Sequence, residues 1–330
     1  MTKLADDLED ERAARMVLSM IAEPDDAVTG RVLALVGAVE TVRLIEAEDT
    51  VPSLGRVDTM IWREHLAARI DDRLLPALDH ARQSGFGVLI PSDTDWPAGV
   101  NDLHEHAPYV LWSLGNEELL SKQPRDLVTI TGSRAATTYG EHVAGDFAVD
   151  FAADGHTVVG GGAYGIEGAA HRGALARGGS TIAVLAGGLD RPYPSGHREL
   201  LRRISDAGLL VSELPPNAVP TRHRFAARNR LMATMSGATV LVEAGGRSGA
   251  LGTARRAHAL DRVVGAIPGP VTSAASVGPH QLIATNQAML TTSARQITDA
   301  LEAQPPRHQH GLAFRESRRP PSAERPSRSL

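Results

Sequence analysis

Apolar residues recur at spacings of three and four through the first 80 residues of the chain. The spacing is that of one face of an α-helix, and it is clearest in residues 7–22 (DLEDERAARMVLSMIA) and 29–47 (TGRVLALVGAVETVRLIEA). A further helical stretch ends at Gly85. The pattern predicts a small helical domain over residues 1–80, whose expected role is packing or spacing rather than chemistry.

From about residue 81 to residue 303, short apolar runs alternate with amphipathic stretches. This alternation is typical of a parallel sheet covered by helices on both faces, so we predict an α/β fold with a doubly wound, mostly parallel, Rossmann-like sheet. The predicted strands are 87–90, 127–130, 156–159, 181–186, 208–212, 239–244 and 263–267. The predicted helices are 139–154, 167–177, 196–206, 228–236, 249–260 and 293–301.

The last segment, 304–330, has a different composition. It is rich in proline, serine and arginine, a composition that cannot bury a core. We expect a disordered basic tail there.

Composition narrows the class of protein. The chain has 330 residues and no cysteine, which excludes disulfides and thiolate zinc sites. Its start lacks the basic and apolar regions of a signal peptide, and no apolar run approaches the roughly 20 residues that span a bilayer. We therefore expect a cytoplasmic protein that does not enter the membrane.

Charge is distributed unevenly along the chain. The formal net charge is -5, and residues 1–80 carry 17 acidic against 9 basic residues. Residues 220–262, by contrast, carry 8 arginines and only Glu243 and Asp261 as acids. A basic cluster in an acidic chain indicates a dedicated site for an anion.

The loop after the predicted strand 127–130 has the composition of a phosphate cradle. Its sequence is TGSRAATTYG, in which Gly132 lets the backbone approach a ligand, Ser133 offers a hydroxyl and Arg134 a guanidinium fork. The helix that follows should present free N–H groups near Tyr139 and Gly140. The alternative is that Arg134 only pairs with a neighbouring carboxylate.

A second glycine-rich loop follows the strand 156–159. Gly160, Gly162 and Gly165 satisfy the spacing G-x-G-x-x-G, which by itself is a weak signal for a dinucleotide. The loop follows the second strand of the unit, and no suitable acid follows it. We therefore expect close approach to a phosphate-bearing ligand without a cofactor, and a packing role for His171.

The densest cluster is RHRFAARNR, residues 222–230. Three prolines before it predict an extended loop that brings its first residues to the mouth of the sheet, with a helix starting at residue 228. Guanidinium groups pair with phosphates and an exposed aromatic ring can stack on a base, so the cluster indicates single-stranded nucleic acid. The alternative is that the ring anchors the core and the arginines pair with the acidic N-terminal domain. The candidate contacts are Arg222, Arg224, Phe225, Arg228, Asn229 and Arg230.

A third loop of this kind, VEAGGRSGALGTARR, follows the strand 239–244. Gly245, Gly246 and Gly249 should leave it open, and Ser248 adds a hydroxyl. Because the carboxyl ends of parallel strands meet at one edge of the sheet, these loops should lie together.

Taken in order, the motifs GSR…YG, GIEGAAHRGAL…GGLDRPYP, LLVSELPP, FAARNR, EAGGRSGALGTA and AIPG resemble the DNA-processing protein A (DprA, or Smf) family over roughly residues 10–290. The resemblance implies that residues 1–80 form a SAM-like helical domain. It also implies a protein that binds and protects single-stranded DNA, forms a homodimer through the Rossmann-like domain and loads a RecA-type recombinase during natural transformation. The implied DNA-binding residues are Gly132, Ser133, Arg134, Arg222, Arg224, Phe225, Arg228, Asn229, Arg230, Ser248 and Gly249.

The chain departs from the family pattern in places. The usual S-G-x-A-x-G-I-D reads GGAYGIE, with Tyr164 at a commonly basic position, and His280 stands where asparagine is usual. We also expect no winged-helix domain after residue 303.

An enzyme is not expected. Related nucleotide phosphoribohydrolases carry a glutamate where this chain has Arg256, and no catalytic triad, metal cluster or Walker lysine is visible. We predict no catalytic residues, no metal and no cofactor. The alternative to DNA binding is a nucleotide-sensing module, and Phe225 among its arginines favours the extended strand.

Overall fold

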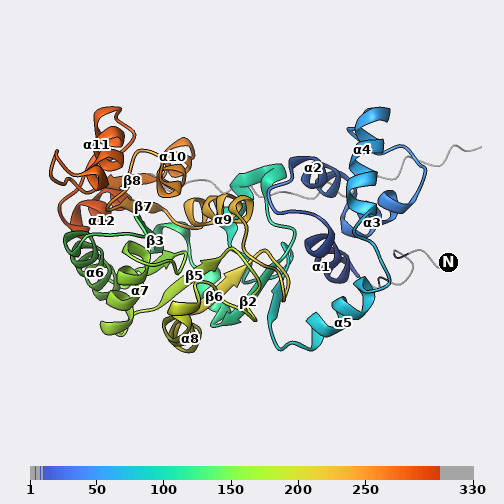
Figure 1. Cartoon of the computed structure of the whole chain (residues 1–330), viewed down its shortest axis with the longest axis horizontal. Coiled ribbons are helices and arrows are strands. Elements are labelled where there is room, and N and C mark those ends of the chain that lie inside the picture. The colour runs from blue at the N-terminus through green and yellow to red at the C-terminus, as the bar shows by residue number, and fades with distance from the viewer. Residues whose placement is uncertain (1–3, 5–7, 9, 305–330) are drawn as a thin grey trace, which may run out of the picture.

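The computed structural model describes Leu4, Leu8 and residues 10–304. Its N-terminal part is helical, as the sequence predicts, and lies at the right of Figure 1. Asp10 and Asp26 start the first two helices because their carboxylates accept the free backbone N–H groups of Ala13 and Val28. The helices are α1 (Glu11–Ile21), α2 (Ala27–Val36), α3 (Ala38–Glu46), α4 (Arg56–Ala67) and α5 (Leu74–Gln83).

The rest of the described chain forms an α/β unit around one sheet of nine strands, with the order β1-β2-β6-β5-β4-β3-β7-β8-β9. Strands β1 and β2 pair antiparallel at one end, and all other pairs except β2–β6 are parallel. The strands are β1 (Gly87–Leu89), β2 (Leu111–Gly115), β3 (Leu127–Thr131), β4 (Thr157–Gly160), β5 (Thr181–Leu185), β6 (Leu209–Ser212), β7 (Ala238–Leu241), β8 (Val263–Ala266) and β9 (Met289–Leu290).

Helices cover both faces of the sheet (Figure 1). On one face, α6, α7 and α12 bury alanine and phenylalanine side chains against β3, β4 and β7. On the other face, α9 packs against β3, β4, β5 and β6, and α10 and α11 pack against β7 and β8. The helices are α6 (Thr138–Ala153), α7 (Ile166–Ala176), α8 (Arg198–Ala207), α9 (Arg222–Met235), α10 (Gly249–Ala259), α11 (Val277–Ala284) and α12 (Ala294–Ala303). The doubly wound, mostly parallel sheet predicted from the sequence is therefore confirmed.

The strand order reverses next to β3. From β3 the chain proceeds outward through β4, β5 and β6, and it then returns by α9 to place β7 on the other side of β3. The loops after β3 and β7 diverge at this point, which is where open α/β sheets bind ligands. The topology thus selects the carboxyl ends of β3 and β7 as the place to look for a site.

Some elements differ from the sequence-based prediction. Helix α9 starts at Arg222, six residues earlier than expected, because Thr221 accepts the N–H of Arg224 and caps it. The cluster 222–230 is therefore helical rather than partly an extended loop. Strands β2 and β9 and helix α11 were not predicted, and β1 pairs antiparallel with β2.

One core joins the N-terminal helices to the sheet. Leu18 and Ile21 of α1 belong to the same buried cluster as Trp112 of β2 and Leu210 of β6. The predicted tail, apart from Gln304, lies outside the described residues. Among the helices of the described part, none has both the length and the apolar character needed to cross a membrane.

His171 on α7 gives the fold a measurable pH dependence. Its ring is fully buried and its Nδ1 lies 2.8 Å from the Thr181 hydroxyl, and burial lowers the pKa of His171 to about 4. Between about pH 6.5 and 4 the unfolded chain takes up a proton that the folded chain does not, so we expect up to roughly 3 kcal/mol of stability to be lost over that range. Urea unfolding at several pH values measures this loss.

The matched variants are His171→Gln and His142→Gln, since the side chain of His142 is 77% exposed. His171→Gln should flatten the acid-dependent loss, whereas His142→Gln should leave it unchanged. Equal pH profiles for wild type and His171→Gln would show that His171 does not cause the effect.

Candidate nucleic-acid interface

A cavity of ≈ 1030 Å³ opens at the point where the strand order reverses. Its walls are the loop after β3, the loop after β7 and the first turns of α9 and α10. Three of the predicted clusters, around Arg134, Phe225 and Ser248, therefore meet in one place.

Backbone contacts hold the loops of this cavity together. The Ser133 N–H donates to the Glu243 carbonyl at 2.6 Å, and the Ile166 N–H donates to the Ser133 carbonyl at 3.2 Å. Gly165 has φ +70, and a Cβ there would lie 2.4 Å from the Ser133 carbonyl oxygen. A Cβ at Gly132 would meet the Glu243 carbonyl at 2.7 Å. These two glycines are needed because the loops pack closely against each other. The sequence had suggested instead that they allow a ligand to approach.

The start of α6 is not free, contrary to expectation. Glu243 accepts hydrogen bonds from the Thr137 N–H at 2.9 Å and from its hydroxyl at 2.6 Å, and the Gly140 N–H donates to the Thr137 hydroxyl. A carboxylate of the protein itself therefore occupies this positive helix end. Tyr139 points elsewhere and donates to the Pro268 carbonyl.

Arg228 lies under the cavity rather than at its rim. It is 5% exposed, and its Nη1 donates to the Val184 carbonyl at 3.1 Å and lies 3.8 Å from the Glu167 carboxylate. A Cβ at Gly161 would fall 1.1 Å from Nη1, so this glycine provides the space for the guanidinium. The Nε of Arg228 is buried without a hydrogen-bond partner among the described residues.

Burial affects the pKa values of Arg228 and Glu167 differently. Burial lowers the pKa of Arg228, although the nearby carboxylate opposes this effect. Burial by itself would raise the pKa of Glu167, but Arg228, the Thr131 hydroxyl and the Ala163 N–H outweigh it, so the pKa lies below its ordinary value. Both groups are charged at neutral pH, and Glu167 is fixed between the ends of β3 and β4.

Phe225 is half-buried and belongs to a cluster of cations and rings. The guanidinium carbon of Arg134 lies 4.4 Å from the ring centroid, and that of Arg228 lies 5.7 Å away. The ring of Tyr193 packs edge-to-face on Phe225 at 5.9 Å. Phe225 is thus neither a free stacking platform nor an anchor of the main core; it holds Arg134 at the cavity mouth by a cation–π contact.

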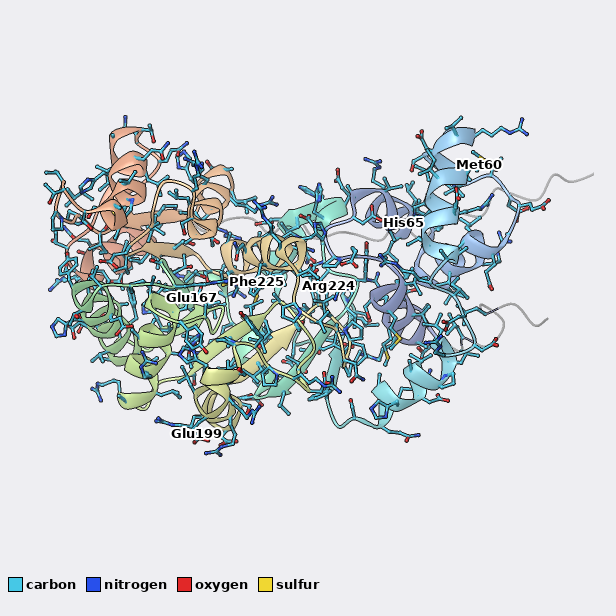
Figure 2. All side chains as sticks on the ribbon, viewed as in Figure 1. Met60, His65, Glu167, Glu199, Arg224 and Phe225 are labelled. Atoms are coloured by element: carbon cyan, nitrogen blue, oxygen red, sulfur yellow. The ribbon has the colours of Figure 1, made fainter. Side chains whose placement is uncertain are left out.

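Arg224 points away from the cavity, toward the N-terminal helices (Figure 2). It forms a bidentate pair with Glu23, with both N–O distances at 2.9 Å, and His223 lies 3.1 Å from the Pro24 carbonyl. The interpretation that some arginines pair with the acidic N-terminal region is correct for this residue. Arg224 connects α9 to the loop between α1 and α2.

Arg230 has no free face for a phosphate. Its side chain is fully buried and forms a bidentate pair with Glu213, with one distance of 2.6 Å, and lies 3.4 Å from Asp25. Although burial opposes it, the charge of Glu213 raises the pKa of Arg230. The expectation of a DNA contact therefore fails for Arg230, because its position on the inner side of α9 directs it into the protein.

The loop after β7 stays open. Ser248 caps α10 by accepting the Ala250 N–H, and Asn229 donates from its side chain to the Gly249 carbonyl at 3.3 Å. Gly246 is exposed. These contacts fix the direction of α10 beside α9 and leave the loop backbone accessible.

The arginines that remain around the cavity are exposed, and no carboxylate of the described residues lies within ion-pair distance of them. They therefore give the cavity an uncompensated positive charge. The set comprises Arg134, Arg222, Arg247, Arg255 and Arg256.

Arg247, Arg255 and Arg256 belong to the basic cluster seen in the sequence, but they were not among the predicted site residues. The contact between Tyr193 and Phe225 was not predicted either. The available signal for the first group was position: Arg247 lies in the loop after β7, and Arg255 and Arg256 are adjacent on α10, the helix that follows this loop. For Tyr193 the sequence held no signal, because its neighbour Phe225 is 32 positions away in helix α9.

The α/β part of the chain matches a known protein family. The family model for DNA recombination-mediator protein A matches residues 87–302. The chain belongs to the DNA recombination-mediator protein A family. The resemblance inferred from the motifs is thereby confirmed.

Relatives within the family align with more than half of the chain. A putative DNA processing protein DprA of Mycobacterium tuberculosis is 47% identical over 276 residues, which cover 81% of this chain and 69% of that protein. Protein Smf of Escherichia coli is 40% identical over 176 residues, which cover 53% of this chain and 47% of that protein.

Solved structures of family members have the same architecture. The X-ray structure of DprA from Streptococcus pneumoniae matches with a TM-score of 0.66 at 29% identity and covers 88% of this chain and 93% of that one. A DprA structure from Helicobacter pylori, described as revealing a single-stranded DNA binding mode, matches with a TM-score of 0.59 at 26% identity. It covers 66% of this chain and 97% of that one.

Arg230 provides a test of the division between structural and free arginines. Arg230→Ala leaves Glu213 buried without its partner, so we expect a loss of about 3–5 kcal/mol in the free energy of unfolding. The double variant Arg230→Met, Glu213→Leu removes both charges and should recover most of that loss. Urea or thermal unfolding measures both. An Arg230→Ala protein as stable as wild type would contradict the buried pair.

Proposed function

We propose that the chain binds single-stranded DNA in the cavity at the carboxyl ends of β3 and β7. The observation that carries the proposal is the set of cavity arginines without carboxylate partners, placed beside the ring of Phe225. Guanidinium groups pair with phosphates, and aromatic rings and guanidinium planes stack on bases. Single-stranded DNA presents phosphates and unpaired bases, and the cavity offers guanidinium groups for the first and an aromatic ring for the second. The H. pylori relative, whose structure is described as giving insight into a single-stranded DNA binding mode, supports the proposal.

Arg134 and Phe225 act as a unit in this account. Arg134 lies over the ring, and its exposed guanidinium is available to a phosphate. A base can stack on the composite surface of ring and guanidinium, and it need not enter the core. Gly132, Ser133, Asn229, Ser248 and Gly249 line or border the cavity and add backbone and side-chain polar groups.

Arg228 contributes to binding through its field. Its charge is only partly neutralised by Glu167 at 3.8 Å, and it lies in a region of low dielectric where charges act more strongly than in water. Phosphates in the cavity therefore experience its positive charge without direct contact. Arg224 serves to attach α9 to the N-terminal helices.

The family supports a proposal about the role in the cell. We propose that the bound strand is protected and loaded with a RecA-type recombinase in DNA uptake and recombination, that the protein acts as a homodimer in the cytoplasm, and that binding rather than catalysis is its activity. The family's description as recombination mediator supports this role. The nucleotide-sensing alternative lacks a specific observation in its favour, because a mononucleotide needs fewer cations than line this cavity.

The first prediction concerns the form of DNA. The site is a concave cavity lined by loops and by the first turns of α9 and α10, unlike an exposed helix of the kind that enters a major groove, so single strands should bind more tightly than duplex of equal length. Affinity should fall steeply with salt because several phosphates release counterions, with a slope in log–log form of about 0.7 per phosphate contact. Fluorescence anisotropy at several salt concentrations measures both. Equal affinity for duplex, or a flat salt response with competition by mononucleotide, would favour the nucleotide-sensing alternative.

The second prediction separates phosphate from base contacts. Arg134→Ala should weaken all single-stranded oligonucleotides by a similar factor and lower the salt slope, since phosphate contacts carry no sequence information. Phe225→Leu should cost roughly 1–3 kcal/mol of binding. It should change the slope less than Arg134→Ala does. The same titrations apply.

Arg202→Ala is the matched control, because Arg202 is exposed on α8 and pairs with Glu199 and Asp206. It should bind like wild type. Loss of binding in Arg202→Ala equal to that in Arg134→Ala would indicate that the overall charge, and not the cavity, governs affinity.

A further inference from the structure

Two exposed tyrosines lie beside the cavity on neighbouring loops. Tyr164, in the loop after β4, is 44% exposed, and Tyr193, in the loop after β5, is 48% exposed. A single exposed aromatic side chain is ordinary, whereas exposed rings grouped beside a charged cavity mark a place where a ligand or partner can bind. The two rings border a shallow groove of ≈ 20 Å³, whose floor includes Gly161.

Each ring is held in place from one side. Tyr193 packs edge-to-face on Phe225 at 5.9 Å with an interplanar angle of 65°. Tyr164 packs on His197 at 4.6 Å and 72°. Neither hydroxyl has a hydrogen-bond partner among the described residues. Within the described part of the chain, the two rings are therefore oriented by packing and not by hydrogen bonds of their hydroxyls.

The groove continues directly from the cavity. Arg134, Ala163 and Phe225 line both of them. A DNA strand with a phosphate on Arg134 can therefore place one neighbouring nucleotide in the cavity and the other over the groove. The groove is too small to enclose a nucleotide, so a base there would lie on the exposed surfaces of the two rings while the neighbouring arginines hold the backbone.

We propose that Tyr164 and Tyr193 form a second base-stacking subsite, which takes the nucleotide next to the one at Phe225. The inference rests on the proposed function. It adds the course of the bound DNA, which leaves the cavity across the loops after β4 and β5. Both rings present a π-face to a base of any sequence. The subsite therefore adds affinity and fixes the course of the strand without selecting bases.

The test compares two substitutions at each tyrosine. Leucine removes the π-system and keeps an apolar side chain, whereas phenylalanine keeps the ring and removes the hydroxyl. We expect Tyr193→Leu and Tyr164→Leu each to weaken binding to oligothymidylate about tenfold. Tyr193→Phe and Tyr164→Phe should bind like wild type, and the salt slope should stay constant throughout because no charge is removed.

Tyr139→Leu is the matched control. Tyr139 is 47% exposed, but it lines neither the cavity nor the groove, so its removal should leave affinity unchanged. A second readout uses oligonucleotides with one abasic site at successive positions. In the wild type, loss of the base at the subsite should weaken binding. In Tyr193→Leu, loss of the same base should not weaken binding further.

The outcomes distinguish this inference from the proposed function. Wild-type binding that persists unchanged in both leucine variants would overturn the subsite alone. Phenylalanine variants as weak as the leucine variants would also overturn it, because the hydroxyl and not the ring would then be responsible. A wild-type protein that binds no single-stranded DNA would overturn the proposed function, and the subsite with it.

Discussion

The site depends on a buried guanidinium. Arg228 lies beneath the carboxyl ends of the strands, and removing such a group from water costs several kcal/mol unless charge and hydrogen bonds compensate. The Glu167 carboxylate and the Val184 carbonyl provide this compensation, and the glycine at position 161 provides the space. Because Glu167 is itself fixed by Thr131 and by the loop after β4, one buried charge connects α9 to three strand ends. The arrangement of the cavity mouth follows from this connection.

The arginines of the chain divide into two groups by their partners. Arg224 and Arg230 are paired with carboxylates and hold α9 against the N-terminal helices and β6. The cavity arginines have no carboxylate near them among the described residues and lie in water. An acidic protein can therefore present a positive cavity, because the one carboxylate among the cavity's described lining residues, that of Glu167, is paired with the buried Arg228. The net charge of the chain says little about the local field that a strand of DNA experiences.

The parallel sheet and the general place of the site could be predicted from the sequence. Alternating apolar runs indicate the parallel sheet, and the loops after its strands indicate where ligands bind, because both follow from local periodicity and chain direction. The direction of a side chain on a helix is a different matter. Arg228 and Arg230 are two residues apart and face different carboxylates, which depends on the tertiary packing of α9 and on Glu213, a residue outside the motif. The same reason hides Tyr193, which meets Phe225 only in three dimensions.

We infer that single-stranded DNA binds in the cavity at the point where the order of the β-strands reverses. Hydrogen–deuterium exchange with and without a single-stranded oligonucleotide tests it most directly, because it reports each backbone segment separately. Peptides covering residues 131–136, 222–231 and 245–256 should exchange more slowly in the complex, whereas helix α4 (Arg56–Ala67) should be unaffected. Protection of α4 with unchanged exchange around the cavity would contradict the account.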